Sequence, residues 1–192
     1  MSYAPTDRPT CAASIRPRIL IVNIEEAAEL AAEFDTVITA GPTADEVAAY
    51  FTHPDHLVVE FHDTIHRSWG GPSRADVRTI LEFAATRVDR SILIHCHAGM
   101  SRSTAAAIAI LTSWGLAPDV AFEHARGARP AEAIDENRLF VPNALLLSHA
   151  DALLDSELVE HDPEVARDLL HIDPEGWAED RDLDEWSADG SW

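Results

Sequence analysis

Residues 95–103 read HCHAGMSRS, and the segments on either side of them determine the expected fold. Before this stretch, residues 91–94 (SILI) are apolar and rich in β-branched side chains, which predicts a short buried strand. After it, residues 104–111 (TAAAIAIL) predict a helix that packs closely through small side chains. A strand, a tight loop and a helix in this order direct several backbone N–H groups at one point, so the stretch predicts an anion-binding site.

The same loop holds residue types suited to nucleophilic attack on a phosphoryl group. Cys96 supplies a thiol, and a helix amino terminus surrounded by amides favours the reactive thiolate form of a cysteine. Arg102 carries a planar fork of donors that matches two phosphoryl oxygens at once. Gly99 allows the backbone to wrap closely around an oxyanion. We expect Ser103 to hydrogen-bond the thiolate and His95 to support the loop from behind.

The spacing of Cys96 and Arg102 is not decisive by itself, because chance gives such a pair in about 15% of chains of this composition. The other cysteine, Cys11, has Pro17 at the corresponding position. The whole pattern H-C-x-A-G-x-S-R-S, between a strand and a helix, resembles the signature of cysteine-dependent protein tyrosine phosphatases. It is similar to the dual-specificity-like form, which is also found in small bacterial enzymes and ends in Ser-Arg-Ser.

The resemblance extends over residues 18–155 and implies both a fold and a phosphate-binding loop. The implied fold is α/β, with a mainly parallel central sheet of four to five strands, flanking helices and a helical C-terminal part. The implied phosphate-binding loop consists of His97, Ala98, Gly99, Met100, Ser101 and Arg102.

The family also uses an aspartate as general acid, because the leaving oxygen needs a proton. This aspartate lies about thirty residues before the cysteine, on a loop after a neighbouring strand. Residues 57–62 predict such a strand, and Asp63 follows it. Asp55 and Asp76 are weaker candidates, since they fall in the preceding turn and the following helix. The predicted catalytic residues are therefore Cys96, Arg102, Asp63 and Ser103.

Strand and helix patterns alternate along the rest of the chain. Strands are predicted over residues 18–22, 36–40, 57–62 and 92–95. Helices are predicted over residues 25–34, 43–51, 74–88, 101–114, 118–126 and 137–154, with a further short helix over 163–170 as an option. This alternation independently favours an α/β domain, and the loop lies at the carboxyl end of a strand, where such sheets bind ligands.

Two downstream segments extend the resemblance. Residues 125–130 (ARGARP) and 142–147 (PNALLL) are similar to an arginine-proline and a proline-asparagine pattern of these phosphatases. In the family the asparagine supports the loop, which implies this role for Asn143. The residue itself is equally suited to cap the helix that follows it.

The 192-residue chain has a net charge of −20, and its acidic residues are concentrated near the C-terminus. We divide the chain into an N-terminal extension (residues 1–17), a catalytic domain (18–155) and an acidic, tryptophan-containing tail (156–192). We expect the tail to be solvated and largely disordered, and its carboxylates could also screen the cationic site. The strong negative charge argues against nucleic acids and anionic membrane surfaces as partners.

The chain has no apolar run long enough for a membrane span and no signal-type N-terminus, which favours a cytoplasmic protein. Two distant cysteines do not form a disulfide framework, and a thiolate nucleophile suits a reducing compartment. The histidines around the loop lack metal-ligand spacing, so we expect neither a metal nor another cofactor. The sequence does not indicate an oligomeric state.

Together these features predict a phosphomonoester hydrolase with a phosphocysteine intermediate, acting on phosphotyrosine, and with phosphoserine or phosphothreonine left open. The expected partner is a phosphorylated protein or a small phosphomonoester. Inositol phosphates, lipids and nucleotide ends are disfavoured because His97 and Met100 stand where phosphoinositide phosphatases often have lysine. A non-catalytic phosphate-binding protein is a further alternative. A rhodanese-type sulfurtransferase is disfavoured because its loop closes one residue sooner.

Overall fold

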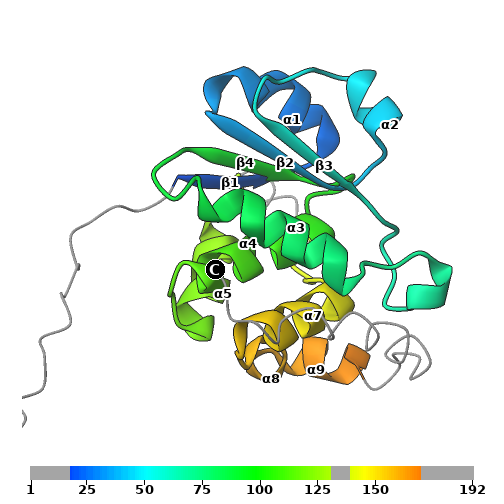
Figure 1. Ribbon diagram of the computed structural model, residues 1–192, viewed down its shortest axis with the longest axis vertical. Helices are drawn as coiled ribbons and strands as arrows, with labels where there is room; N and C mark the ends of the chain where they lie inside the picture. The colour runs from blue at the N-terminus through cyan, green and yellow to red at the C-terminus, as the bar shows by residue number, and fades with distance from the viewer. Residues whose placement is uncertain (1–17, 131–138, 170–192) are drawn as a thin grey trace, which may run out of the picture.

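The central element of the structure is a parallel sheet (Figure 1). The structure is a computed structural model that describes residues 18–130 and 139–169. In this part of the chain four strands pair in the order β1-β4-β2-β3. Their bounds are Ile19–Val22 for β1, Thr36–Gly41 for β2, His56–Glu60 for β3 and Ile92–His95 for β4.

The order of the strands brings distant parts of the sequence to one edge of the sheet. β4 lies between β1 and β2, and all four of its residues are buried, as its apolar sequence predicts. In the register of β2 and β4, Thr39 lies beside His95. In the register of β2 and β3, Gly41 lies beside Glu60. The loops that follow these three strands therefore start close together at the carboxyl edge of the sheet.

Helices cover both faces of the sheet (Figure 1). One side has α1 (Ile24–Leu30), the short 3-10 turn η1 (Ala31–Glu33) and α2 (Ala44–Ala48). The other side has α3 (Arg74–Ala85) and α4 (Arg102–Ser113), with a 3-10 turn η2 (Arg67–Trp69) before α3. Two further helices, α5 (Pro118–Gly127) and α7 (Ala144–Leu154), pack on this layer, α5 on α4 and α7 on both α3 and α4. The short helices α8 (Leu158–His161) and α9 (Pro163–Leu169) pack in turn on α7.

α4 is the most deeply buried helix, since every residue from Arg102 to Leu111 is buried. Its alanines allow it to lie close to β1, β2 and β4 while α5 and α7 cover its other side. Fully buried Ile108 and Ile110 each contribute roughly 1.5–3 kcal/mol from the burial of apolar surface. This packing fixes the first turn of α4, which carries Arg102 and Ser103, relative to the sheet.

The α/β fold and the parallel sheet predicted from the sequence are confirmed, and most strands and helices lie close to their predicted bounds. The helix predicted over residues 137–154 is an exception, because α7 begins only at Ala144, where Asn143 caps it, and residues 139–143 are not helical. Another difference concerns the region after residue 155, which we assigned to the tail. Leu158 on α8 and Val165 on α9 are buried in the main core, at 0% and 2% exposure. The packed body thus continues through α9, because two apolar residues within an acidic stretch suffice to dock these short helices. Residues 170–192 lie outside the described part.

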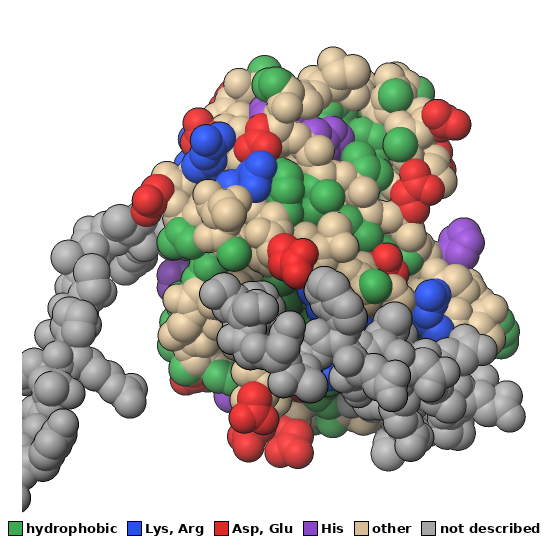
Figure 2. All heavy atoms as spheres, viewed as in Figure 1, with side chains coloured by type: hydrophobic (Ala, Val, Ile, Leu, Met, Phe, Trp, Pro, Cys, Tyr) green, Lys and Arg blue, Asp and Glu red, His purple; other side chains and the backbone are tan. Residues whose placement is uncertain are grey.

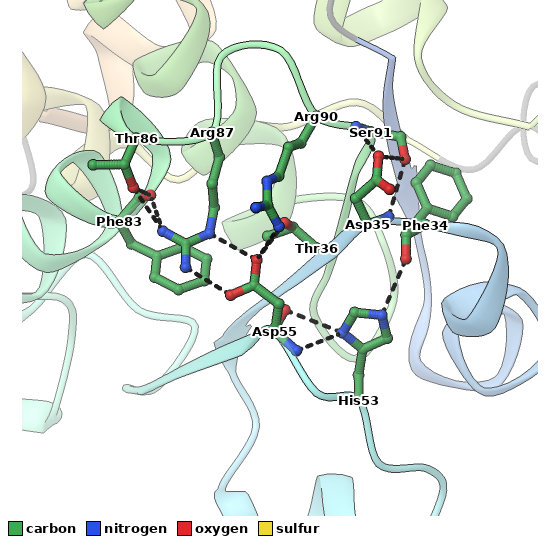
Figure 3. Close-up of polar contacts among 10 residues, drawn as sticks. All are labelled: Phe34, Asp35, Thr36, His53, Asp55, Phe83, Thr86, Arg87, Arg90 and Ser91. Carbon is green, nitrogen blue, oxygen red and sulfur yellow. Dashed lines mark hydrogen bonds and ion pairs between the residues drawn. The ribbon is translucent and has the colours of Figure 1, made fainter.

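The opposite edge of the sheet is held by an ion-pair cluster, shown in Figure 3. Asp55, just before β3, accepts two short bonds from Arg87, with Nη2 to Oδ1 at 2.6 Å and Nε to Oδ2 at 2.9 Å. Arg90 and the hydroxyl of Thr36 also reach Oδ2, at 3.4 and 2.8 Å. These contacts hold the pKa of Asp55 at about 2, the bond from Arg87 being the main cause. In Figure 2, arginine and acidic side chains gather where Figure 1 places the α3–β4 connection.

None of the helices in the described residues is both long enough and apolar enough to cross a membrane.

Candidate active site

The loop between β4 and α4 has the geometry of an anion-binding cradle. Its carbonyl groups point to neighbouring segments, where backbone N–H groups bind them. The pairs are Ile24 N to His97 O (3.2 Å), Val141 N to Met100 O (3.2 Å) and Asn143 N to Ser101 O (3.3 Å). In contrast, none of the backbone N–H groups of residues 97–102 donates to any described residue. The loop therefore keeps its donors available for a ligand.

Gly99 is required for this shape. Its φ is +69°, in the left-handed region that favours glycine. A Cβ at this position would lie 2.8 Å from the carbonyl carbon of Val22 and 2.9 Å from the backbone nitrogen of Asn23. The loop consequently lies directly against the junction of β1 and α1, and a side chain at Gly99 would push it away.

Cys96 lies at the base of the loop and is 1% exposed. Its Sγ is 3.2 Å from the Oγ of Ser103, a distance suited to a hydrogen bond involving sulfur. Ser103 is fully buried in the first turn of α4, so its hydroxyl has a fixed position. The pair places a hydroxyl group beside the sulfur of Cys96, just before the amino terminus of a 12-residue helix.

Arg102 is a buried guanidinium with an unused donor. Only 6% of the residue is exposed, and its Nη1 donates to the carbonyl oxygen of Phe61 at 3.2 Å. Its Nε is buried and has no hydrogen-bond partner among the described residues. The Oδ2 of Asp63 lies 3.6 Å from this Nε, at ion-pair but not hydrogen-bond distance, so the donor remains available to an anion in the loop.

Gly41, at the end of β2, makes room for this guanidinium. A Cβ at Gly41 would lie 2.6 Å from Cζ of Arg102, and the φ of Gly41 is +110°. Sequence reasoning did not identify Gly41, although a glycine followed by Pro42 at the end of a predicted strand is a recognisable signal. What the sequence alone does not show is that β2 is the neighbour of β4.

Asp63 lies at the opening of the loop, with 41% of its side chain exposed. Its Oδ1 accepts hydrogen bonds from Ser101 Oγ at 2.7 Å and from Asn143 Nδ2 at 3.1 Å. Its Oδ2 is 3.6 Å from Nε of Arg102. The structure thus brings together Asp63 and the cysteine loop from different strands. In this arrangement a carboxylate oxygen of Asp63 lies beside the Nε of Arg102.

Asn143 makes both contacts that the sequence left open. Its Oδ1 accepts from the backbone N–H of Leu146 at 3.0 Å and so caps α7. Its Nδ2 donates to Asp63 and, at 3.4 Å, to the carbonyl oxygen of Thr64. Since its backbone N–H also reaches Ser101, Asn143 joins α7 to both the Asp63 segment and the loop.

The two weaker aspartate candidates lie elsewhere. Asp55 is bound in the ion-pair cluster at the amino edge of the sheet. Asp76 accepts hydrogen bonds from Ser73 and forms the capping box of α3.

His97 and Glu46 form a second pair at the rim of the loop. The His97 Nε2 is 3.7 Å from Oε1 of Glu46, and both side chains are half exposed. The pKa of Glu46 is lowered, mainly because the N–H and hydroxyl of Thr43 donate to it, with smaller effects of His97 and Arg102. Sequence reasoning missed Glu46, whose only signal was its place in the capping box that begins α2.

His95 lies behind the loop and is fully buried. Its Nδ1 is 3.4 Å from the carbonyl oxygen of Cys96, and its Nε2 is 2.6 Å from Oγ1 of Thr39. Burial lowers the pKa of His95 to about 4, so the ring is neutral at pH 7.

Within the described residues, no three His, Cys, Asp or Glu side chains are arranged to hold a metal ion.

No protein-family model matches the chain, and no curated protein matches its sequence. Solved structures do match. Human DUSP28 is 23% identical, with a TM-score of 0.51, over 72% of this chain and 92% of DUSP28. A mutant form of Tk-PTP is 24% identical, with a TM-score of 0.50, over 74% of this chain and 93% of that protein. The chain has the fold of the dual-specificity-type cysteine phosphatases. The fold implied by the sequence resemblance is thereby confirmed.

Proposed function

We propose that this protein is a phosphomonoester hydrolase that works through a phosphocysteine intermediate and acts on phosphotyrosine in proteins. The observation that carries the proposal is the buried Nε of Arg102, which has no hydrogen-bond partner among the described residues and lies beside a loop of unused N–H groups. Such donors, fixed before substrate binds, stabilise the charge of a phosphoryl group during transfer. The fold shared with cysteine phosphatases supports the same conclusion.

The first step transfers the phosphoryl group to sulfur. The thiolate of Cys96 attacks phosphorus, the sulfur–phosphorus bond forms, and the bond from phosphorus to the ester oxygen breaks. Asp63 in its acid form gives a proton to that leaving oxygen. The loop N–H groups and Arg102 hold the three remaining oxygens, while the Ser103 hydroxyl faces the sulfur at 3.2 Å.

The second step releases phosphate. Water attacks phosphorus, Asp63 takes a proton from that water, and the sulfur–phosphorus bond breaks with its electron pair returning to Cys96. The Ser103 hydroxyl is positioned to stabilise the thiolate as it leaves. Free phosphate and the starting thiolate result, so the cycle closes without a metal or another reactant.

An incoming phosphate has to compete with Asp63 for Arg102. The Asp63 Oδ2 is 3.6 Å from Nε of Arg102, whereas a bidentate complex with phosphate needs that donor. Substrate binding therefore has to replace the Asp63 contact, which frees the carboxyl group to face the leaving oxygen. Ser101 and Asn143 keep Asp63 at the loop during this exchange.

The rim of the loop favours a substrate with one phosphoryl group. Glu46 beside His97 places a carboxylate near the entrance, and Asp63 adds a second. These charges repel a polyanion such as an inositol polyphosphate more strongly than a single phosphotyrosine. We therefore propose a phosphorylated protein as partner in a reducing, cytoplasmic environment, with non-protein phosphomonoesters as the alternative class.

Hydrolysis of a simple phosphoaryl ester tests the proposal. The wild type should be active and inhibited by vanadate, and Cys96→Ser should lose turnover while still binding vanadate. Cys11→Ser is the matched control and should keep wild-type rates, because Cys11 has no arginine six positions later. Binding of vanadate without turnover in the wild type would instead indicate the non-catalytic phosphate-binding alternative.

The rates of hydrolysis of three substrates then show which class of phosphomonoester the protein prefers. A phosphotyrosine peptide should be hydrolysed fastest, ahead of the matched phosphoserine peptide and of an inositol polyphosphate. Faster hydrolysis of the inositol polyphosphate would overturn the assignment to proteins and leave the chemistry intact.

A further inference from the structure

Behind the cysteine loop, three polar side chains from three strands form a continuous line. His95 ends β4, Thr39 lies beside it on β2, and His56 begins β3. The Oγ1 of Thr39 is 2.6 Å from Nε2 of His95 and 2.8 Å from Nε2 of His56. At the inner end, Nδ1 of His95 is 3.4 Å from the carbonyl oxygen of Cys96. His56 is only partly buried, so the line runs from near the surface to the nucleophile residue.

Both rings are neutral at pH 7, because burial lowers the pKa of His56 and of His95 to about 4 each. The titratable groups that act on them are other histidines: His53 on His56, and His56 and His97 on His95. Each of these disfavours a second proton on the ring it faces. Every ring in the line therefore carries one N–H and one bare nitrogen.

The acceptor at the inner end determines the direction of every hydrogen bond. A carbonyl oxygen only accepts, so Nδ1 of His95 must carry the proton that faces Cys96. The Nε2 of His95 is then bare and accepts the hydroxyl proton of Thr39. With its proton used in this way, the Thr39 oxygen accepts from Nε2–H of His56. His56 thus supplies the donor that starts the line.

Aromatic packing holds the two rings in these positions. Phe51 stacks on His56, with ring centroids 5.5 Å apart and planes inclined by 17°. The same Phe51 meets the ring of His95 edge-on, again at 5.5 Å. Among the described residues, Thr39 is the hydrogen-bond partner of both Nε2 atoms. Because both rings are held in place and share Thr39 as partner, the fold itself sets which atom donates and which accepts in each of these hydrogen bonds.

We infer that His56 is a positioning residue for the reaction at Cys96: through Thr39 it keeps His95 in the Nδ1–H form that donates to the Cys96 carbonyl. The inference rests on the proposed function in so far as Cys96 is the nucleophile. The Cys96 carbonyl and the His97 N–H belong to one peptide group, so a donor on the carbonyl makes that N–H a stronger donor. This N–H is among the unused donors of the loop.

Two pairs of variants separate hydrogen bonding from packing. His56→Phe keeps an aromatic ring beside Phe51 but removes the donor, and should lower kcat/KM about 3–10-fold. His56→Gln is the matched control, since its amide restores an N–H donor, and should stay within about 2-fold of wild type. Thr39→Val should cost about 10-fold or more, while Thr39→Ser should keep most activity.

The protonation state of the rings gives a readout that a packing role would not change. Nitrogen-15 NMR of labelled protein at pH 7 should show the His95 proton on Nδ1 and the His56 proton on Nε2. In His56→Phe, the Thr39 oxygen loses its donor and becomes free to accept from His95, so the Nε2–H form of His95 should appear. A wild-type His95 already in the Nε2–H form would overturn the inference.

The rate at which iodoacetate alkylates Cys96 separates this inference from the proposed function. If the wild type hydrolyses no phosphoaryl ester but alkylation slows in His56→Phe and not in His56→Gln, only the proposed function fails. If the wild type is active and His56→Phe matches it in kcat/KM, alkylation rate and His95 protonation, only this inference fails. Should His56→Phe not fold, as judged by circular dichroism, Thr39→Val and Thr39→Ser decide by the same measurements.

Discussion

The two edges of the parallel sheet each hold an arginine near an aspartate, and the two arginines are used in opposite ways. At the amino edge, Arg87 donates to both oxygens of Asp55, to the carbonyl oxygen of Phe83 and to the hydroxyl of Thr86. At the carboxyl edge, Arg102 donates to a single described acceptor, the carbonyl oxygen of Phe61, and its Nε has none.

This difference separates a structural ion pair at the amino edge from the arginine to which the proposed function assigns phosphate binding. Every guanidinium nitrogen of Arg87 has an acceptor, and its Cζ lies 3.5 Å from the centre of the Phe83 ring. Figure 3 shows that Arg87 and Arg90 both reach Asp55. Arg102 is more deeply buried than Arg87, yet its Nε donates no hydrogen bond to any described residue. Under the proposed function, a phosphoryl group completes the contacts of Arg102 at the carboxyl edge.

The largest expected effect is the loss of the guanidinium fork at the carboxyl edge. Arg102→Lys keeps the charge but not the planar donors, so kcat/KM on a phosphoaryl ester should fall about 10²–10³-fold. The matched Arg87→Lys should keep kcat/KM within about 2-fold and lower the midpoint of thermal unfolding instead. Equal losses of activity in the two variants would contradict the contrast between the two edges.

Removal of the general acid should come next. Asp63→Asn should lower kcat about 10²-fold, because the leaving oxygen no longer receives a proton. It should also flatten the basic limb of the pH–rate profile, and it should not weaken vanadate binding, since the amide no longer competes for Arg102. An unchanged profile would remove Asp63 from this role, and Asp76→Asn provides the control at a carboxylate outside the site.

Gly41→Ala tests whether the fold reserves space for Arg102. The added Cβ would lie 2.6 Å from Cζ of Arg102, so the guanidinium must move, and kcat/KM should fall about 10-fold. Gly115→Ala is the control: its φ of +91° brings similar backbone strain, but nothing lies within 4 Å of the added Cβ. It should lower stability without changing kcat/KM. Full activity of Gly41→Ala would show that the position of Arg102 is not critical.

The smallest effect concerns stability at the amino edge. The pKa of Asp55 falls from its ordinary value of 3.8 to about 2 on folding, mainly because Arg87 donates to it. The unfolded chain therefore binds this proton more tightly, so the contribution of about 2 kcal/mol is complete above pH 3.8 and is lost as the pH falls to about 2. Asp55→Asn should lower the free energy of unfolding by that amount at pH 7, measured in urea, and leave kcat/KM unchanged. If Asp55→Asn lowers the free energy of unfolding by the same amount at pH 2 as at pH 7, the loss does not come from the ionised Asp55 carboxylate.

The sequence predicts what is local and misses what depends on strand neighbours. The strand, loop and helix around Cys96 follow from apolar runs and loop residues that lie next to one another in the chain. Asp63 is a candidate because the family resemblance implies an aspartate about thirty residues before the cysteine, and Asp63 follows a strand of recognisable pattern there. Gly41, Thr39 and His56 act on the site only because β2 pairs with β4 and with β3, and no local pattern shows this pairing. The docking of α8 was hidden because its one buried residue, Leu158, lies in an acidic stretch.

Trapping the intermediate is the most direct test of the central claim, that Cys96 carries the phosphoryl group. Wild-type protein mixed with a phosphoaryl ester, quenched in acid within one turnover and digested, should yield a phosphorylated peptide that contains Cys96. Asp63→Asn should form the same adduct more slowly, because the leaving oxygen lacks its proton donor in the first step, and Cys96→Ser should yield no cysteine adduct. Turnover by the wild type with the phosphoryl group on another residue, or turnover by Cys96→Ser at the wild-type rate, would contradict the account.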